Sequence, residues 1–95
     1  MLGRLLGNPK LTEIDVQRVA SRRPYPSECL REIFRHPRWG HRRGVQEALI
    51  LNPHTPLRIA CGLAELLDGM QARRVARQPA LHPLVRAAAR RRAGG

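Results

Sequence analysis

Proline divides this chain of 95 residues into segments too short for anything but small secondary-structure elements. Proline has no backbone N–H, so it is disfavoured inside a helix but is accepted in the first helical turn. The stretch LNPHTPLRIA, residues 51–60, has two prolines just before an apolar run. We predict that Asn52-Pro53 forms a turn, and that Thr55 caps a helix whose first residue is Pro56.

The same pattern of a proline turn followed by a helix cap recurs along the chain, which indicates a repeat. Each of four segments opens with a polar residue and proline, continues with a candidate N-cap residue, and ends in an apolar-periodic stretch. The opening prolines are Pro9, Pro24, Pro53 and Pro79, and the candidate caps are Thr12, Ser27, Thr55 and His82. The intervals leave room for one or two short helices in each unit, a pattern typical of an α-helical solenoid.

Apolar periodicity predicts six helices, at about 13–22, 28–35, 42–51, 56–67, 70–77 and 83–92. The Thr12 and Asp15 pair predicts a capping box, and Asp68 a cap for the fifth helix. A short strand at 45–51 is the rival interpretation, but no other segment offers a strand to pair with it. The fourth helix has a narrow polar strip, so we expect it to be central. The side chains expected to point inward are Val16, Val19, Ala20, Leu30, Ile33, Phe34, Val45, Ala48, Leu49, Leu51, Ile59, Leu63, Leu66, Ala72, Val75, Ala76, Leu84, Val85 and Ala88.

The length predicts one domain over residues 1–95, with 1–7 and 93–95 frayed. Aromatic residues make up only 3% of the chain, so the core must consist of Leu, Val, Ile and Ala, and the dominant Leu and Ala favour helix. No apolar run approaches the roughly 20 residues of a membrane span, and the N-terminal residues do not form a secretory signal. We therefore expect a cytoplasmic protein that does not insert into a membrane.

The run HPRWGHRRGVQEALILNPHTPLRIACGLAELL, residues 36–67, resembles the leucine-rich-repeat-variant and HEAT-like families of bacterial helical repeats. The matching residues are Trp39, Arg43, Val45, Asn52, Pro53, Thr55 and Pro56. The resemblance implies an all-α fold, a short α-solenoid of about six helices stacked in pairs and used for binding. Some leucine-rich-repeat-variant proteins hold an iron–sulfur cluster with a group of cysteines. This chain has no such group, so we expect no cofactor.

The charge is strongly positive, with 18 basic and 7 acidic residues and a net charge of +11. This excess favours an acidic protein surface or a nucleic acid as partner. The alternative is arginine usage typical of a GC-rich genome, with the side chains solvated on helix faces. No acidic residue follows Asp68, whereas seven arginines do. The residues predicted to bind a partner are Trp39, Arg42, Arg43, Arg73, Arg74, Arg77, Arg90 and Arg91.

Trp39 lies in a loop rich in Pro, Gly, Arg and His. Trp and Arg are enriched at binding hot spots, so one interpretation is an exposed anchor, or a ring that stacks on a base. The other is that Trp39 fills the gap between the second and third helices.

The residues suited to catalysis or metal binding form no convincing pattern. Cys29 and Cys61 are 32 residues apart in apolar surroundings, as expected for small buried hydrophobes. The histidines His36, His54 and His82 flank turn prolines and suit turn or cap positions, and with His41 they leave a zinc site open only as a weak alternative. We expect no metal and no enzyme. The sequence favours a non-enzymatic helical-repeat module that binds a protein through an Arg-rich face; the alternative is sequence-nonspecific binding of DNA or RNA through phosphates.

Overall fold

A computed structural model describes residues 5–94, and in this range all regular secondary structure is helical. The six helices are α2 (Glu13–Ala20), α3 (Ser27–Arg35), α4 (Arg43–Leu51), α5 (Leu57–Ala64), α6 (Gly69–Ala76) and α7 (Pro83–Gly94). The prediction of six helices is confirmed, and residues 45–51 are helical rather than a strand. Residues 1–4 and 95, which belong to the segments expected to fray, lie outside the described residues.

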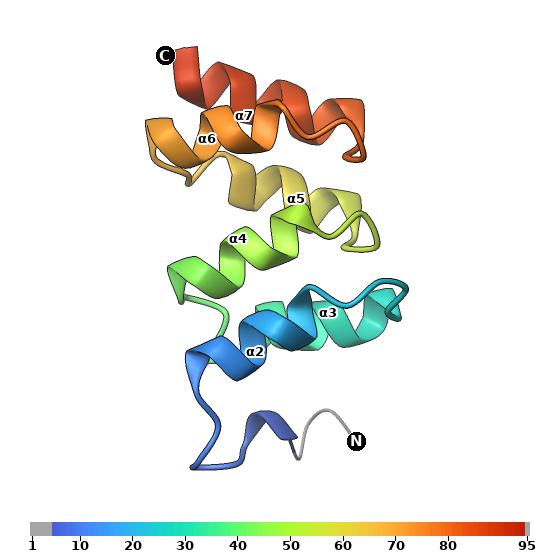
Figure 1. Cartoon of the computed structure of the whole chain (residues 1–95), viewed down its shortest axis with the longest axis vertical. Coiled ribbons are helices and arrows are strands. Elements are labelled where there is room, and N and C mark those ends of the chain that lie inside the picture. Colours follow the sequence, from blue (N-terminus) through green and yellow to red (C-terminus); the bar gives the residue numbers. More distant parts are fainter. Residues whose placement is uncertain (1–4, 95) are drawn as a thin grey trace.

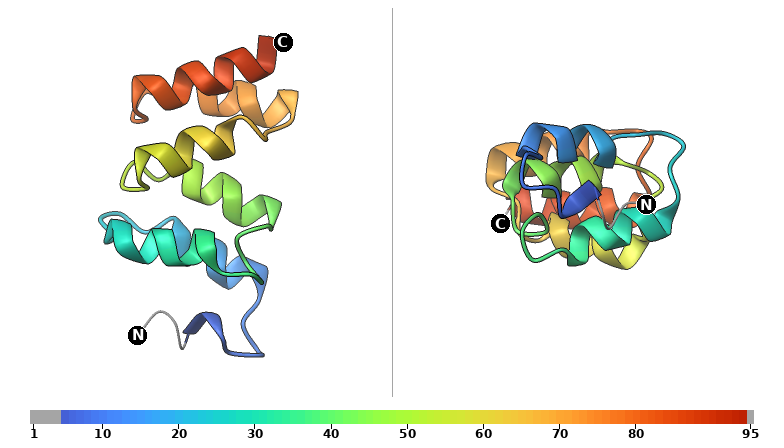
Figure 2. Two further views of the ribbon diagram at one scale, coloured as in Figure 1. Left: turned by 180° about the vertical axis from the view of Figure 1, so that it is seen from behind. Right: turned by 90° about the horizontal axis from the view of Figure 1, so that it is seen from below.

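The helices alternate between two layers along the long axis of a molecule that measures 39 × 22 × 17 Å. Helices α2, α4 and α6 form one layer, and α3, α5 and α7 form the other (Figures 1 and 2). Consecutive helices run in opposite directions, so the helices of one layer are parallel to one another (Figure 1). The tightest packing joins α6 to α7, α2 to α4, α5 to α7 and α4 to α5.

Four turns are built in the same way, around a proline that follows an Asn or His. In each, a side-chain atom of the residue before proline accepts the backbone N–H two positions on, because proline has no N–H of its own. The bonds are Lys10 N–H to Asn8 Oδ1 (2.9 Å), Arg38 N–H to His36 Nδ1 (3.2 Å), His54 N–H to Asn52 Oδ1 (3.0 Å) and Leu84 N–H to His82 Nδ1 (3.1 Å). The expected turn or cap role of His36 and His82 is thereby confirmed.

Besides His82, helix caps are confirmed at two of the predicted positions. Thr12 and Asp15 form a capping box at the start of α2, and Asp68 accepts the N–H of Gln71 at the start of α6. Ser27 is wrong as a cap, because it is already helical and Pro26 occupies the cap position. Thr55 is also wrong, since its hydroxyl donates to the Leu49 carbonyl (2.6 Å) and so closes the end of α4 instead.

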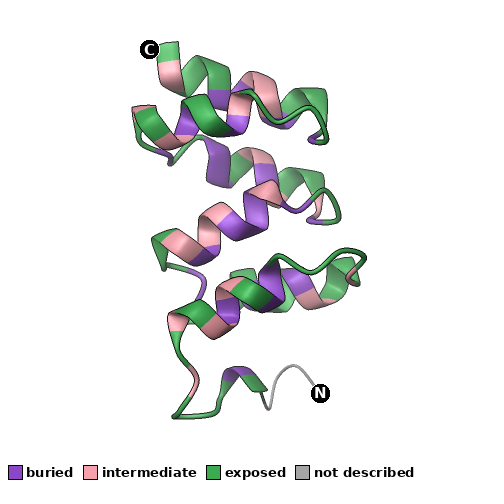
Figure 3. Cartoon of the chain, in the orientation of Figure 1, coloured by how far each residue is buried: buried purple, intermediate pink, exposed green. Residues whose placement is uncertain are grey.

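The core runs between the two layers and consists almost entirely of aliphatic side chains (Figure 3). Most of the predicted inward stripe is confirmed as buried, and Leu51, Ile59 and Ala76 are half-buried. The confirmed buried residues are Val16, Val19, Ala20, Leu30, Ile33, Val45, Ala48, Leu49, Leu63, Ala72, Val75, Val85 and Ala88.

Three residues expected in the core are exposed: Phe34 (36%), Leu84 (57%) and Leu66 (69%). For Leu66 the cause is local. Helix α5 ends at Ala64, before the predicted residue 67, and the chain tightens so that the Leu67 N–H bonds to the Ala64 carbonyl (3.4 Å). This turn directs Leu67 inward and Leu66 outward. Within α5 itself, Leu57, Arg58 and Gly62 are exposed, so this helix is more exposed than expected.

The segments predicted to fray include residues that the structure describes at both ends of the chain. Leu6 is only 1% exposed and forms part of the core, and α7 continues through Gly94. Within residues 5–94, no helix is long and apolar enough to cross a membrane.

Candidate functional site

A groove of about 640 Å³ lies between α3 and α5, on the side of the molecule formed by the α3, α5 and α7 layer. We call it the α3/α5 groove. It is lined by Arg31, Phe34, Arg35, Pro56, Arg58, Ile59, Gly62, Leu63 and Leu66. Helix α5 packs directly on α7, so the open interval in this layer is the one between α3 and α5.

In the opposite layer, α2 and α4 pack together at the position along the stack where α3 and α5 are apart. This difference explains the groove. Helix α2 packs against α4, and Gly44 at the start of α4 lies where a Cβ would collide with the Gln17 side chain of α2. The side chain of Gln17 thus occupies the space that Gly44 leaves open, and a larger residue there would require Gln17 to move. On the other side, Phe34 of α3 and Leu66, which follows α5, line the space between the two helices.

The floor of the groove is apolar and accessible. It is formed by Phe34, Ile59, Gly62, Leu63 and Leu66. A Cβ added to Gly62 would meet no atom within 4 Å, so the groove is open directly above this residue. Exposed apolar surface rimmed by polar residues is typical of a site of protein or ligand contact.

The rim carries positive charge. Arg31 and Arg35 lie one helical turn apart on α3, and Arg58 extends from α5 on the other side. Within the described part of the chain these three arginines form no ion pair with a carboxylate. No acidic residue is among the lining residues. The α3/α5 groove therefore combines an apolar floor with three guanidinium groups that are available to an anionic partner.

Several arginines predicted to bind a partner are instead engaged with carboxylates of the same molecule. Arg42 lies 4.0 Å from Glu13 and Arg43 lies 4.0 Å from Asp68. These pairs are exposed and therefore weak. The closest contact, 3.3 Å, joins Arg74 to Glu47 across α4 and α6. All three pairs lie on the α2, α4 and α6 side, where they partly neutralise the expected basic face.

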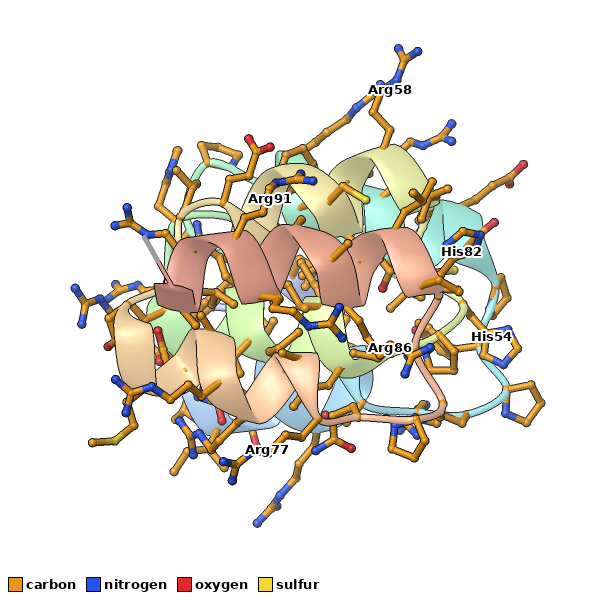
Figure 4. All side chains as sticks on the ribbon, turned by 90° about the horizontal axis from the view of Figure 1, so that it is seen from above. His54, Arg58, Arg77, His82, Arg86 and Arg91 are labelled. Carbon is orange, nitrogen blue, oxygen red and sulfur yellow. The ribbon has the colours of Figure 1, made fainter. Side chains whose placement is uncertain are left out.

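The remaining predicted arginines do not form one continuous region. Arg73, Arg77, Arg90 and Arg91 are all exposed. Viewed along the stack, however, Arg77 projects from the α6 side, whereas Arg91 lies over the α5 side together with Arg58 (Figure 4). The sequence predicts one surface for these arginines, whereas Arg77 and Arg91 lie on different sides of the molecule.

Trp39 is 2% exposed, which excludes it as a surface anchor in this structure and favours the interpretation that it fills a gap. Its Nε1–H donates to the Leu6 carbonyl oxygen (2.9 Å), and the guanidinium carbon of Arg38 covers the ring at 4.4 Å from the centroid. The indole thus seals the interior beneath the N-terminal segment and does not line the α3/α5 groove.

The cysteines are half-buried and unpaired, one on α3 and one on α5. Burial raises the pKa of the Cys61 thiol, Glu65 adds to this effect, and Arg91 opposes it. Among residues 5–94 there is no cluster of three or more His, Cys, Asp or Glu side chains that could hold a metal ion. The residues that line the groove include no Ser, Thr, Cys, His, Lys or carboxylate side chain.

The residues of the α3/α5 groove were missed in the sequence, although part of the signal was present. Arg31, Phe34 and Arg35 are spaced by three and four residues, which places them on one side of α3. Arg58 and Gly62 belong to the narrow polar strip from which we predict that the fourth helix is central. These residues of α3 and of α5 border a common groove only because of how the two helices are placed relative to each other. The periodicity of the sequence does not predict this placement.

Comparison of the chain with protein-family models, with curated proteins and with solved structures finds no match.

Proposed function

We propose that this chain is a non-enzymatic helical-repeat module that binds a protein partner through the α3/α5 groove. The observation that carries the proposal is the apolar floor bounded by Arg31, Arg35 and Arg58. Buried apolar anchors surrounded by polar contacts are the usual arrangement of a protein interface, and Arg is enriched in it.

The proposal includes a repeat architecture of the leucine-rich-repeat-variant or HEAT-like kind. Two observations support it. The helices alternate between two layers with parallel neighbours in each (Figure 1). The turns at Asn8, His36, Asn52 and His82 use the same side-chain hydrogen bond. Recurring units of this kind bury their apolar faces mainly against adjacent units and leave an extended surface for binding.

A protein partner accounts for the groove better than a nucleic acid does. Phosphates require cations but no apolar floor, and stacking on bases requires exposed aromatic rings. Here Trp39 is buried, Phe34 is the one aromatic ring that lines the groove, and the arginines Arg42, Arg43 and Arg74 lie within 4.0 Å of carboxylates. We therefore retain nucleic-acid binding as the alternative, centred on the free arginines of α6 and α7.

The proposal can be tested with a variant that fills the groove. Gly62→Leu adds a side chain where the structure has open space, and Gly62→Ala is the matched control. When immobilised, the unmodified protein and the Gly62→Ala variant should both retain a partner protein, whereas the Gly62→Leu variant should not. The result should be the same with or without nuclease. Retention that is equal in all three forms would contradict the proposal.

A separate titration tests the alternative. If the protein contacts four phosphates of duplex DNA, the logarithm of the binding constant should fall with the logarithm of the salt concentration with a slope of about −3.6. Replacing Arg73 and Arg77 by Gln would flatten this slope. Tight, steeply salt-dependent DNA binding that Gly62→Leu leaves unchanged would favour the nucleic-acid function. No measurable affinity at about 50 mM salt, where phosphate contacts are strong, would exclude it.

A further inference from the structure

The α3/α5 groove is a surface depression rather than an enclosed pocket. Phe34 and Leu66 on its floor are 36% and 69% exposed. Small-molecule sites usually surround most of the ligand surface, and this groove cannot do so. It suits a ligand that has one apolar face and remains solvated on the other.

The sides of the groove are helices, which restricts the kind of peptide that it can accept. The backbone N–H and C=O groups of α3 and α5 are largely used within the helices, so they are not free to pair with an extended peptide. Residues 5–94 also contain no sheet edge for strand addition. A helical segment satisfies its own backbone hydrogen bonds and needs only side-chain contacts, as in other complexes where a helix occupies a groove.

The charges on the rim define the complementary partner. Arg31 and Arg35 are separated by four residues on α3, so their side chains start about 6 Å apart. Carboxylates four residues apart on a helix alongside have the same spacing. Arg58 on the opposite rim can bind a third carboxylate on the other flank of that helix. Guanidinium–carboxylate pairs are strong and directional, so acidic residues at these positions would set the register.

A second copy of this chain is a poor occupant. The net charge of +11 opposes association of two copies. The acidic partner must therefore be a different protein.

We propose that the α3/α5 groove binds an acidic amphipathic α-helix of a partner protein. Apolar side chains of that helix contact Phe34, Ile59 and Leu66, and its carboxylates pair with Arg31, Arg35 and Arg58. This inference rests on the proposed function and specifies the partner. Helix α3 is about 13 Å long at 1.5 Å per residue, so the contact involves roughly three helical turns of the partner. A contact this small corresponds to a transient complex.

The test is selection from two displayed peptide libraries, one of 14-residue segments held helical on a scaffold and one of unconstrained segments. Selection is performed on the intact protein, and hits are then measured against variants. We expect hits from the helical library, with acidic residues four apart beside an apolar stripe. Replacing these acids by Gln should weaken binding at least tenfold, and so should raising salt from 50 to 500 mM.

The protein variants locate the complex. Gly62→Leu, and the triple change of Arg31, Arg35 and Arg58 to Gln, should each weaken binding at least tenfold. The control that changes Arg73 and Arg77 to Gln should alter it less than twofold. Circular dichroism checks the fold of each variant. Phe34→Ala, which removes an exposed ring of the floor, serves as a second probe if Gly62→Leu unfolds.

The outcomes separate this inference from the proposed function. Selected peptides that are neutral, basic or extended, but whose binding is still weakened by Gly62→Leu, would overturn the proposal of an acidic helix. The proposal of a protein-binding groove would stand. Failure of both libraries to produce any hit sensitive to Gly62→Leu or Phe34→Ala would overturn both. Self-association, or binding to anionic lipid vesicles, that Gly62→Leu abolishes would assign the groove to a second copy or a membrane surface and would overturn both as well.

Discussion

The indole N–H of Trp39 donates a hydrogen bond of 2.9 Å to the carbonyl oxygen of Leu6, 33 residues earlier in the chain. Leu6 and Trp39 are 1% and 2% exposed, so the bond lies inside the protein. It fastens the N-terminal segment over the loop that joins α3 to α4. A loop residue that the sequence marked as a candidate for binding is therefore part of the core.

We expect Trp39→Phe to lower the free energy of unfolding by about 1–3 kcal/mol, because it leaves the buried Leu6 carbonyl without a donor. Trp39→Ala should cost about 3–5 kcal/mol through loss of packing. Denaturant titration measures both values. The exposed aromatic Phe34 is the matched control, and its change to Ala should cost much less. Equal costs at the two positions would contradict the core role of Trp39.

Asn52 is 1% exposed, and its side chain joins three backbone groups. The Nδ2 group donates to the carbonyls of Ala20 (2.9 Å) and Arg22 (2.8 Å), and Oδ1 accepts the His54 N–H. Asn52→Asp keeps the acceptor but removes both donors, so we expect a loss of several kcal/mol, at about 1–3 kcal/mol for each buried group left unpaired. Asn8→Asp is the control, since Asn8 forms the same turn at the surface. A small effect at Asn52 in thermal or urea unfolding would show that its two donor bonds are dispensable.

Two glycines should respond in opposite ways to replacement by alanine. A Cβ at Gly62 meets no atom within 4 Å, so Gly62→Ala should stabilise α5 by about 0.5–1 kcal/mol. A Cβ at Gly40 would collide with the backbone carbonyl of Phe34, so Gly40→Ala should destabilise the protein by about 1–3 kcal/mol. Melting temperatures of the two variants should therefore move to either side of that of the unmodified protein. A rise for Gly40→Ala would be inconsistent with this close approach.

The capping box of α2 predicts a dependence on acid. The Asp15 carboxylate accepts hydrogen bonds from the Thr12 backbone N–H and hydroxyl, which lower the pKa of Asp15. A carboxyl with a lowered pKa in the folded state stabilises that state above its ordinary pKa of about 4 and loses this contribution as the pH falls further. Asp15→Asn should therefore unfold at lower urea than the unmodified protein at pH 7. The difference should shrink at pH 2–3, and a difference that stays constant with pH would exclude the charged cap.

The Cys61 thiol should be slow to alkylate at neutral pH, because burial raises its pKa and only the thiolate reacts. Arg91 opposes this shift, so Arg91→Gln should slow the reaction further. Mass spectrometry after iodoacetamide treatment, in a Cys29→Ala background, measures the rate. The thiol of the urea-unfolded chain is the reference, and an equal rate in the folded chain would disprove the protection.

The helices could be predicted from the sequence because their signals are local. Proline turns, the Thr12 and Asp15 box and the Asp68 cap lie within a few residues of the groups that they satisfy. Thr55 was misassigned because its hydroxyl had two possible uses, as cap of α5 or as donor to the end of α4, and only the folded turn selects the second.

The candidate site depends on relationships between helices that the sequence pattern does not encode. Phe34 has the character of a core residue, yet it is exposed because no helix covers the interval between α3 and α5, whereas Leu66 is directed outward by the tight turn after α5. In the same way, the pairing of Arg74 with Glu47 follows from the packing of α4 against α6. Charge along the chain indicated an anionic partner, whereas the position of the unpaired arginines followed only from the fold.

The close approach of α2 and α4 at Gly44, opposite an open interval between α3 and α5, has a mechanical consequence. Two rigid bodies joined along one edge rotate most easily about that edge. A rotation of α2 and α3 about the α2–α4 contact would change the separation of Arg35 from Arg58 more than the distance between α2 and α4, because the two arginines lie on the far side of the molecule from that contact. The width of the α3/α5 groove therefore depends on how firmly α2 and α3 together pack against α4.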